Sequence, residues 1–241
     1  MCTVTIIPKG GDDFVLTSNR DEAPDRIPLT PDFYSINNVK MLFPKDEKGG
    51  GTWIGLSEKN RLICLLNGGF ICHVKESTYR VSRGVVVKDL LATDDIVLAI
   101  EEYDLDNVEP FTLVIADWNN KLRFFELVWD GAQKYFNKLP IEPKIWSSST
   151  LYSNEMKQDR LSWFNAYKEN NDLNAESILE FHKTAGLENK EYGVIMDRGD
   201  VKTTSVTQVE KTDGIVKMDY LSLKNNTTTS KSFKTLVTVN E

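Results

Sequence analysis

The chain begins Met1-Cys2-Thr3-Val4-Thr5-Ile6-Ile7. From Thr3 onward, polar and apolar residues alternate as in a half-buried strand. Removal of Met1 would leave Cys2 with a thiol and a free α-amine. Their ordinary pKa values are about 8.5 and about 7.7–8.0, so the amine can take the thiol proton near neutral pH. The stretch therefore indicates either a nucleophile that carries its own base or an ordinary strand that happens to follow Met-Cys.

The segments around this stretch form predicted β-hairpins. Cys2–Ile7 and Phe14–Asn19 flank a turn rich in Gly and Asp, and Thr52–Ser57 and Arg61–Asn67 form a second pair. The intervening residues 20–44 show little periodicity, which predicts a long surface excursion.

Two helix pairs divide the remaining strands. The first pair is predicted at Ser82–Leu91 and after a cap at Thr93, and the second after caps at Ser153 and Asn174. Strand patterns occupy Phe111–Trp118, Lys121–Trp129, Gln133–Leu139, Ile145–Ser149, Tyr192–Met196, Val201–Glu210, Gly214–Leu223 and Ser232–Val239. This order predicts one α+β domain over residues 1–241, with antiparallel sheets and helices on their outer faces.

Composition excludes several classes of function. Of the 241 residues, 40% are hydrophobic and 27% charged, and the net charge of −7 argues against a nucleic-acid partner. No apolar run is long enough to span a membrane, and no signal-peptide pattern opens the chain. Three cysteines without a Cys-x-x-Cys pair predict a cytoplasmic protein, and His73 and His182 match no metal spacing. We expect no metal and no cofactor.

Two short stretches carry candidate catalytic groups. Asn19-Arg20-Asp21-Glu22 ends the second strand, which a hairpin places beside Cys2. There, a carboxylate can hold the α-ammonium and a guanidinium can lower the thiol pKa; the alternative is a solvated turn with weak ion pairs. Asn67 ends a strand before two glycines, where its amide can donate to an oxyanion or simply form a turn.

Other polar stretches are less specific. Gly49-Gly50-Gly51-Thr52-Trp53 lacks the Lys-Ser/Thr of a phosphate loop and precedes a strand, so we reject a phosphate site. Ser147-Ser148-Ser149 beside Trp146 forms either a pocket lining or a polar strand edge. We expect the substrate to contact Asn19, Trp53, Ser148 and Ser149.

Several of these stretches together resemble the NRDE family, the family of the transport and Golgi organisation protein 2. The resemblance is carried by Met1-Cys2-Thr3-Val4, Ser18-Asn19-Arg20-Asp21-Glu22, Gly50-Gly51-Thr52-Trp53-Ile54-Gly55, Leu66-Asn67, Ser82-Arg83-Gly84, Trp146–Ser153 and Thr203–Val209. It implies a fold similar to N-terminal-nucleophile (Ntn) hydrolases, a four-layer αββα sandwich. More distantly, it implies a relation to cysteine-type choloylglycine hydrolases and penicillin V acylases.

The resemblance also implies roles for single residues. Cys2 occupies the position of the nucleophile, Arg20 and Asp21 fall beside the N-terminus, and Asn67 falls near the oxyanion. The arginine and aspartate of those enzymes are usually separated by two residues, whereas here they are adjacent. Their second asparagine has no clean match, and Ser148, Ser149 or Asn154 are the candidates to replace it.

Two functions of different classes follow. The first is a cysteine Ntn hydrolase, an amidohydrolase or thioesterase, in which Cys2 attacks a small-molecule linear amide or acyl thioester. The second is a non-catalytic protein that binds or traffics a lipid or haem on the same scaffold, since the resembling family is linked to lipid and acyl-CoA homeostasis and to haem trafficking. We take the hydrolase as the first hypothesis and the carrier as its alternative.

Overall fold

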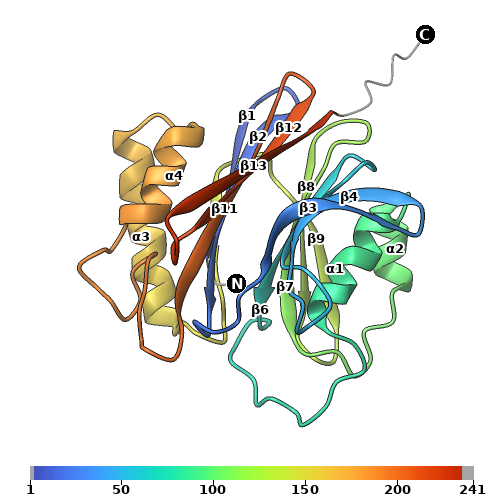
Figure 1. Ribbon diagram of the computed structural model, residues 1–241, viewed down its shortest axis with the longest axis horizontal. Helices are drawn as coiled ribbons and strands as arrows, with labels where there is room; N and C mark the ends of the chain where they lie inside the picture. The colour runs from blue at the N-terminus through green and yellow to red at the C-terminus, as the bar shows by residue number, and fades with distance from the viewer. Residues whose placement is uncertain (1–2, 235–241) are drawn as a thin grey trace.

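Two antiparallel sheets pack face to face, and a pair of helices covers the outer face of each. The computed structural model describes residues 3–234. Helices α1 (Arg83–Ala92) and α2 (Ile96–Glu102) flank one sheet, and α3 (Asn154–Asn170) and α4 (Ala175–Thr184) flank the other (Figure 1). The predicted four-layer αββα sandwich is confirmed. Within the described residues, every helix is too short or too polar to cross a bilayer.

The two sheets differ in how the chain builds them. The six-stranded sheet has the order β10-β1-β2-β11-β12-β13, so it joins both ends of the described chain. Its strands are β1 (Thr3–Gly10), β2 (Asp13–Glu22), β10 (Lys144–Ser147), β11 (Lys202–Thr212), β12 (Ile215–Ser222) and β13 (Thr227–Lys234). The seven-stranded sheet runs in sequence order. Its strands are β3 (Leu29–Ile36), β4 (Val39–Lys45), β5 (Ile54–Ser57), β6 (Arg61–Asn67), β7 (Phe111–Asp117), β8 (Arg123–Trp129) and β9 (Lys134–Leu139).

Strand β1 is buried on both faces, not on one face as the alternation suggested. Val4 and Ile6 join the core between the sheets. Thr3 and Thr5 are also fully buried, beneath the α3–α4 layer. Their hydroxyls bond to Arg160 and His182, and these bonds satisfy the polar atoms that burial removes from water.

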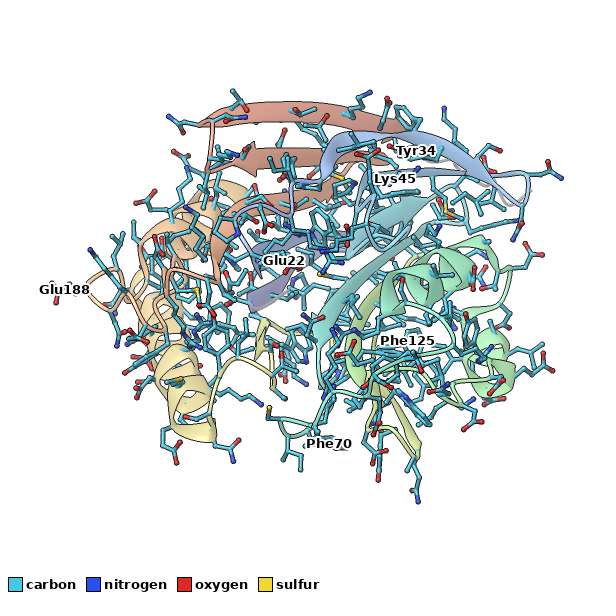
Figure 2. All side chains as sticks on the ribbon, turned by 60° about the horizontal axis from the view of Figure 1, so that its bottom comes forward. Glu22, Tyr34, Lys45, Phe70, Phe125 and Glu188 are labelled. Atoms are coloured by element: carbon cyan, nitrogen blue, oxygen red, sulfur yellow. The ribbon has the colours of Figure 1, made fainter. Side chains whose placement is uncertain are left out.

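The segment predicted as a surface excursion instead forms β3 and β4. Tyr34 of β3 stacks on Phe43 of β4 with 4.4 Å between ring centroids, and Lys45 lies beside Tyr34 (Figure 2). Met41 of β4 is fully buried. The prediction of a surface excursion was wrong because β4 is an apolar run that becomes a strand by pairing with β5. The periodicity of β4 itself does not reveal that pairing.

Three smaller predictions also differ from the structure. Asp95, not Thr93, caps α2 by accepting bonds from two backbone N–H groups. Residues 192–196 form a loop that closes on α4, in which the Val194 N–H donates to the Ala185 carbonyl. The last strand begins at Thr227, and residues 235–239 of its predicted range lie outside the described part of the chain. The caps at Ser153 and Asn174 are confirmed.

Two glycines bring α1 against the chain that enters β5. A Cβ on Gly51 would lie 2.3 Å from the carbonyl carbon of Gly84, and a Cβ on Gly84 would lie 2.8 Å from the Thr52 backbone. The Thr52 N–H donates to the Gly84 carbonyl at 3.2 Å. The glycines of this stretch therefore serve close backbone packing, consistent with the rejection of a phosphate loop.

Candidate active site

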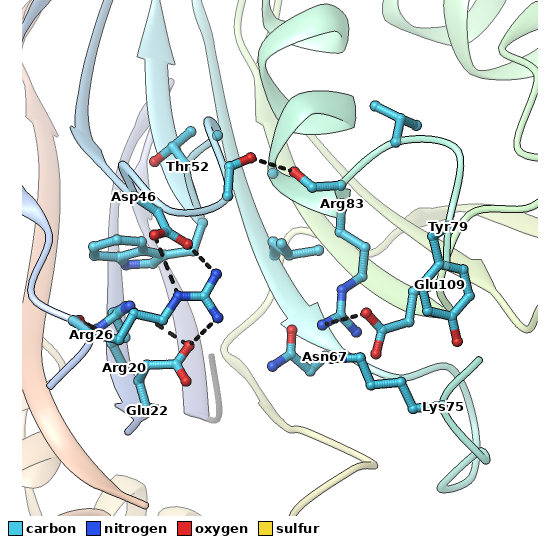
Figure 3. Close-up of a pocket in the computed structure, with 17 residues that line it drawn as sticks. Arg20, Glu22, Arg26, Asp46, Thr52, Asn67, Lys75, Tyr79, Arg83 and Glu109 are labelled. Carbon is cyan, nitrogen blue, oxygen red and sulfur yellow. Dashed lines mark hydrogen bonds and ion pairs between the residues drawn. The ribbon is translucent and has the colours of Figure 1, made fainter. Parts of the chain in front are cut away.

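A pocket of about 290 Å3 opens where β2 and β6 end. It is lined by charged side chains from both sheets and from the loop that precedes α1 (Figure 3). The charged members are Arg20, Glu22, Arg26, Asp46, Lys75, Arg83 and Glu109, and the others used below are Trp53 and Asn67. The pocket thus brings together Arg20, Trp53 and Asn67, three of the residues predicted from sequence.

Arg20 forms one wall of this pocket. Its side chain is buried, and its guanidinium lies 4.5 Å from the centre of the Trp53 ring. One nitrogen donates to the Arg26 carbonyl at 3.1 Å, and another lies 3.6 Å from a Glu22 carboxylate oxygen. Burial lowers the pKa of Arg20 from its usual value, and the carboxylates of Glu22 and Asp46 oppose that shift. The wall therefore holds a fixed positive charge beside an aromatic surface.

Arg83 forms the facing wall, at the first residue of α1. It donates to the Pro110 carbonyl at 3.1 Å and pairs with Glu109 at 3.2 Å. Asn67 projects between the two charged walls (Figure 3). The backbone carbonyl of Asn67 accepts a hydrogen bond from the Ser148 hydroxyl, whereas its side-chain carboxamide has no hydrogen-bond partner among residues 3–234. The backbone of Asn67 is thus anchored, and its amide is available to a ligand.

Asp21 lies on the opposite face of β2 from Arg20, because successive strand residues alternate. It is 3% exposed. One carboxylate oxygen accepts from the Tyr152 hydroxyl at 2.5 Å, and the other accepts from the Thr203 hydroxyl at 2.6 Å. These bonds fix the orientation of the carboxylate at the end of β2.

A buried arginine lies behind Tyr152. Arg160 of α3 is fully buried, with its guanidinium carbon 3.6 Å from the centre of the Tyr152 ring. It donates to the carbonyls of Tyr192 and Gly193 and to the hydroxyl of Thr3. Arg160 therefore connects α3 to the residue that directly follows Cys2.

Asn19 does not line the pocket. Its amide nitrogen donates to the carbonyls of His182 and Val194, and its oxygen accepts from His182 Nδ1 at 2.5 Å. Burial lowers the pKa of His182 to about 3, so the ring is neutral, and its Nε2 accepts a hydrogen bond from the Thr5 hydroxyl. Asn19 is thus occupied beneath α4 and is removed from the candidate substrate contacts.

Ser148 and Ser149 border a neighbouring pocket of about 280 Å3, formed by β10, α3 and the second sheet. Ser148 donates to the Asn67 carbonyl at 2.8 Å, and Ser149 donates to the Gly69 carbonyl at 2.5 Å. These bonds hold the chain that follows Asn67 against β10, and the substrate contact expected of Ser148 and Ser149 stays a prediction. Cys2 lies outside the described residues.

Several residues of this region were missed in the sequence. Arg83 stands inside the quoted Ser82-Arg83-Gly84 motif but had been given no role. Arg26 lies within the stretch that was predicted as a surface excursion, and Asp46 borders it. Their ion pair, at 2.5 Å, fixes one rim of the pocket. Tyr152 stands inside the quoted Trp146–Ser153 stretch but had been given no role, because its partner Asp21 is 131 residues away in the chain. Arg160 carried no signal of its contact with Thr3, which is 157 residues away.

The described residues hold no cluster of three or more metal-binding side chains. Cys64 is fully buried, and burial raises its pKa to about 12, so its sulfur is a neutral thiol and a poor iron ligand. Haem and lipid binding find no support in these residues.

Solved structures of similar fold include a hydrolase, an amidase and an acylase. A variant of conjugated bile acid hydrolase from Clostridium perfringens matches with a TM-score of 0.53 and 13% identity over 99% of this chain and 100% of that one. The Caenorhabditis elegans N-acylethanolamine-hydrolyzing acid amidase ortholog matches with a TM-score of 0.58 and 13% identity, over 86% and 92%. Penicillin V acylase from Agrobacterium tumefaciens matches with a TM-score of 0.52 and 8% identity, over 97% of this chain and 91% of that one.

At such identities, the likeness shows the fold alone. No curated protein matches the chain in sequence. A family model described as Transport and Golgi organisation 2 matches residues 1–185, which is more than half of the chain. The chain therefore belongs to the Transport and Golgi organisation 2 family, on an Ntn-hydrolase-like fold.

Proposed function

We propose that this protein is a cysteine N-terminal-nucleophile hydrolase that cleaves a linear amide or an acyl thioester. The observation that carries the proposal is that Arg20 and Asn67, on different sheets, line one pocket. Thr3, the residue after Cys2, pairs with Asn19 at the adjoining end of β2. Cys2, the nucleophile predicted from sequence, directly precedes Thr3, and Arg20 and Asp21 directly follow the Asn19 that pairs with Thr3.

The proposed reaction begins after removal of Met1. The Cys2 sulfur attacks the carbonyl carbon while the α-amine takes the thiol proton and passes it to the leaving nitrogen or sulfur. Asp21 orients the amine. Asn67 donates to the oxyanion, and Arg20 supplies positive charge. Water then hydrolyses the acyl-enzyme and restores the thiol.

The lining of the pocket favours this hypothesis over the carrier. Charged side chains form both walls, and paired guanidinium and carboxylate groups are a poor surface for a hydrocarbon chain. A polar or charged part of a substrate fits these walls better than a lipid tail or a haem ring does. The substrate we propose is therefore a small acyl compound with a polar group near the scissile bond.

Replacement of the nucleophile gives the decisive test. We expect Cys2→Ala to abolish turnover of a panel containing an N-acylethanolamine, a conjugated bile acid, penicillin V and an acyl thioester. Cys72→Ala is the matched control, since Cys72 is an exposed cysteine outside this pocket. Intact-mass spectrometry should show loss of Met1 and a transient acyl adduct that Cys2→Ala lacks. Undiminished turnover by Cys2→Ala would refute the hydrolase.

Asn67→Ala measures the oxyanion contribution. We expect kcat to fall roughly 10²–10³-fold, the usual cost of one oxyanion donor, with less effect on KM. The Asn67 backbone contact to Ser148 does not depend on its side chain, so the fold should persist. A thermal melt of the variant checks this, and an unchanged kcat would remove Asn67 from the mechanism.

A further inference from the structure

We propose that Tyr152 is a positioning residue for the hydrolase: it holds Asp21 in the orientation that the α-amine of Cys2 requires. The inference rests on the proposed function and extends it to a residue on the segment between β10 and α3. Tyr152 is 3% exposed and lies on the face of β2 away from the charged pocket. Its role would be exerted through Asp21 and not by touching the substrate.

The contact between Tyr152 and Asp21 is short and buried. The phenol donates to Asp21 Oδ2 at 2.5 Å, while Thr203 donates to Oδ1 at 2.6 Å. Two hydroxyl donors on the two oxygens restrict rotation of the carboxylate about its bond to Cβ.

Two guanidinium groups act on the ring of Tyr152. The guanidinium carbon of Arg160 lies 3.6 Å from the ring centre, and that of Arg198 lies 5.5 Å away. A cation over a phenol ring withdraws electron density and strengthens the O–H group as a donor. Arg198 is held in place by the Leu151 carbonyl at 3.1 Å, so both cations have fixed positions.

The charges explain why this arrangement suits a buried carboxylate. Arg160 is fully buried and forms no ion pair with a carboxylate of residues 3–234. A buried cation without an anion is costly, and Asp21 is reached from Arg160 through the single ring of Tyr152. The carboxylate of Asp21 and the guanidinium groups of Arg160 and Arg198 therefore surround the Tyr152 ring. Arg160 also binds Thr3, at the start of β1.

Tyr152→Phe tests the inference, since it removes the hydroxyl and keeps the ring and both cation contacts. We expect kcat to fall about tenfold or more with KM changed less than about twofold, as for a group acting on the reacting atoms after binding. Tyr103→Phe is the matched control: Tyr103 donates to Asp89 at 2.6 Å, far from this pocket, so its loss should cost stability without changing kcat.

A double-mutant cycle separates positioning from general support of the fold. If Tyr152 acts through Asp21, adding Tyr152→Phe to Asp21→Asn should leave kcat at the Asp21→Asn value. Single-turnover acylation followed by mass spectrometry extends the measurement to slow variants. Multiplicative losses, or a Tyr152→Phe enzyme with wild-type kcat, would overturn the inference.

The two proposals fail in different ways. Turnover that survives Cys2→Ala removes the hydrolase and, with it, the basis of the positioning role. Turnover abolished by Cys2→Ala but unaffected by Tyr152→Phe leaves the hydrolase intact and overturns only the role of Tyr152.

Discussion

Two arginines are fully buried among residues 3–234, and of these Arg61 is paired with a carboxylate whereas Arg160 is not. Arg61 of β6 donates twice to one Asp117 oxygen, at 3.1 and 3.0 Å, and also bonds to carbonyls at the end of α1. Arg160 of α3 bonds to two carbonyls, a hydroxyl and the face of a tyrosine, with no carboxylate among the described residues in contact. Each lies between a sheet and its helix layer.

The difference indicates which layer carries function. A buried pair with full hydrogen bonding is stable once formed, and its loss leaves a charge uncompensated. The Arg61 pair therefore fits a purely structural role in the second sheet. Arg160 leaves its charge directed at Tyr152 and Asp21, beside the start of β1, where an oriented carboxylate is useful to the proposed chemistry.

Breaking the Arg61 pair should have the largest effect on stability. Asp117→Asn leaves the Arg61 guanidinium buried without its carboxylate and also removes the ion-pair partner of Arg123, so we expect the free energy of unfolding to fall by about 3–5 kcal/mol. Urea unfolding measures it. The folded fraction should keep wild-type kcat, because the pair is absent from the candidate pocket. A loss below about 1 kcal/mol would contradict the structural role.

Removing the other arginine should have a different signature. Arg160→Met leaves neutral carbonyls and a hydroxyl unpaired, not a bare charge, so we expect it to destabilise less than Asp117→Asn. In turnover assays its kcat should fall about tenfold, because Tyr152 loses the nearer of its two cations. Equal stability losses in the two variants, with kcat unchanged by Arg160→Met, would erase the contrast between the arginines.

The α3–α4 layer should also respond to acid through His182. Its folded pKa of about 3 lies below the unfolded value of 6.5, owing first to burial and then to the charge of Arg160. Between these two pH values, His182 is protonated in the unfolded chain and neutral in the folded chain. This contribution is complete above pH 6.5 and is lost as the pH falls toward 3.

At pH 5.5 the expected loss is on the order of 1 kcal/mol, which urea unfolding at pH 5.5 and at pH 7.5 can measure. His182→Gln should remove this part of the pH dependence while lowering stability at both pH values, because its bonds to Asn19 and Thr5 change. A wild-type protein equally stable at pH 7.5 and 5.5 would contradict a buried neutral histidine.

Local signals predicted much of the fold. The hairpins β1–β2 and β5–β6 and the caps at Ser153 and Asn174 were found because turn and cap chemistry depends on residues within a few positions. Strands β3 and β4 were missed because their burial depends on β5 and on the neighbouring sheet. Arg20, Trp53 and Asn67 line one pocket, whereas Asn19 does not, since a histidine 163 residues away occupies its amide.

The sequence by itself determined that a strand leads into Asn19-Arg20-Asp21-Glu22, because the turn and alternation signals that mark it are local. It also determined the family, through short motifs spread over the chain. Only the tertiary structure decided that the Arg20 face opens on a charged pocket while the Asp21 face meets Tyr152. The physical reason is that strand alternation is local, whereas the packing of α3 against the first sheet joins residues more than a hundred positions apart.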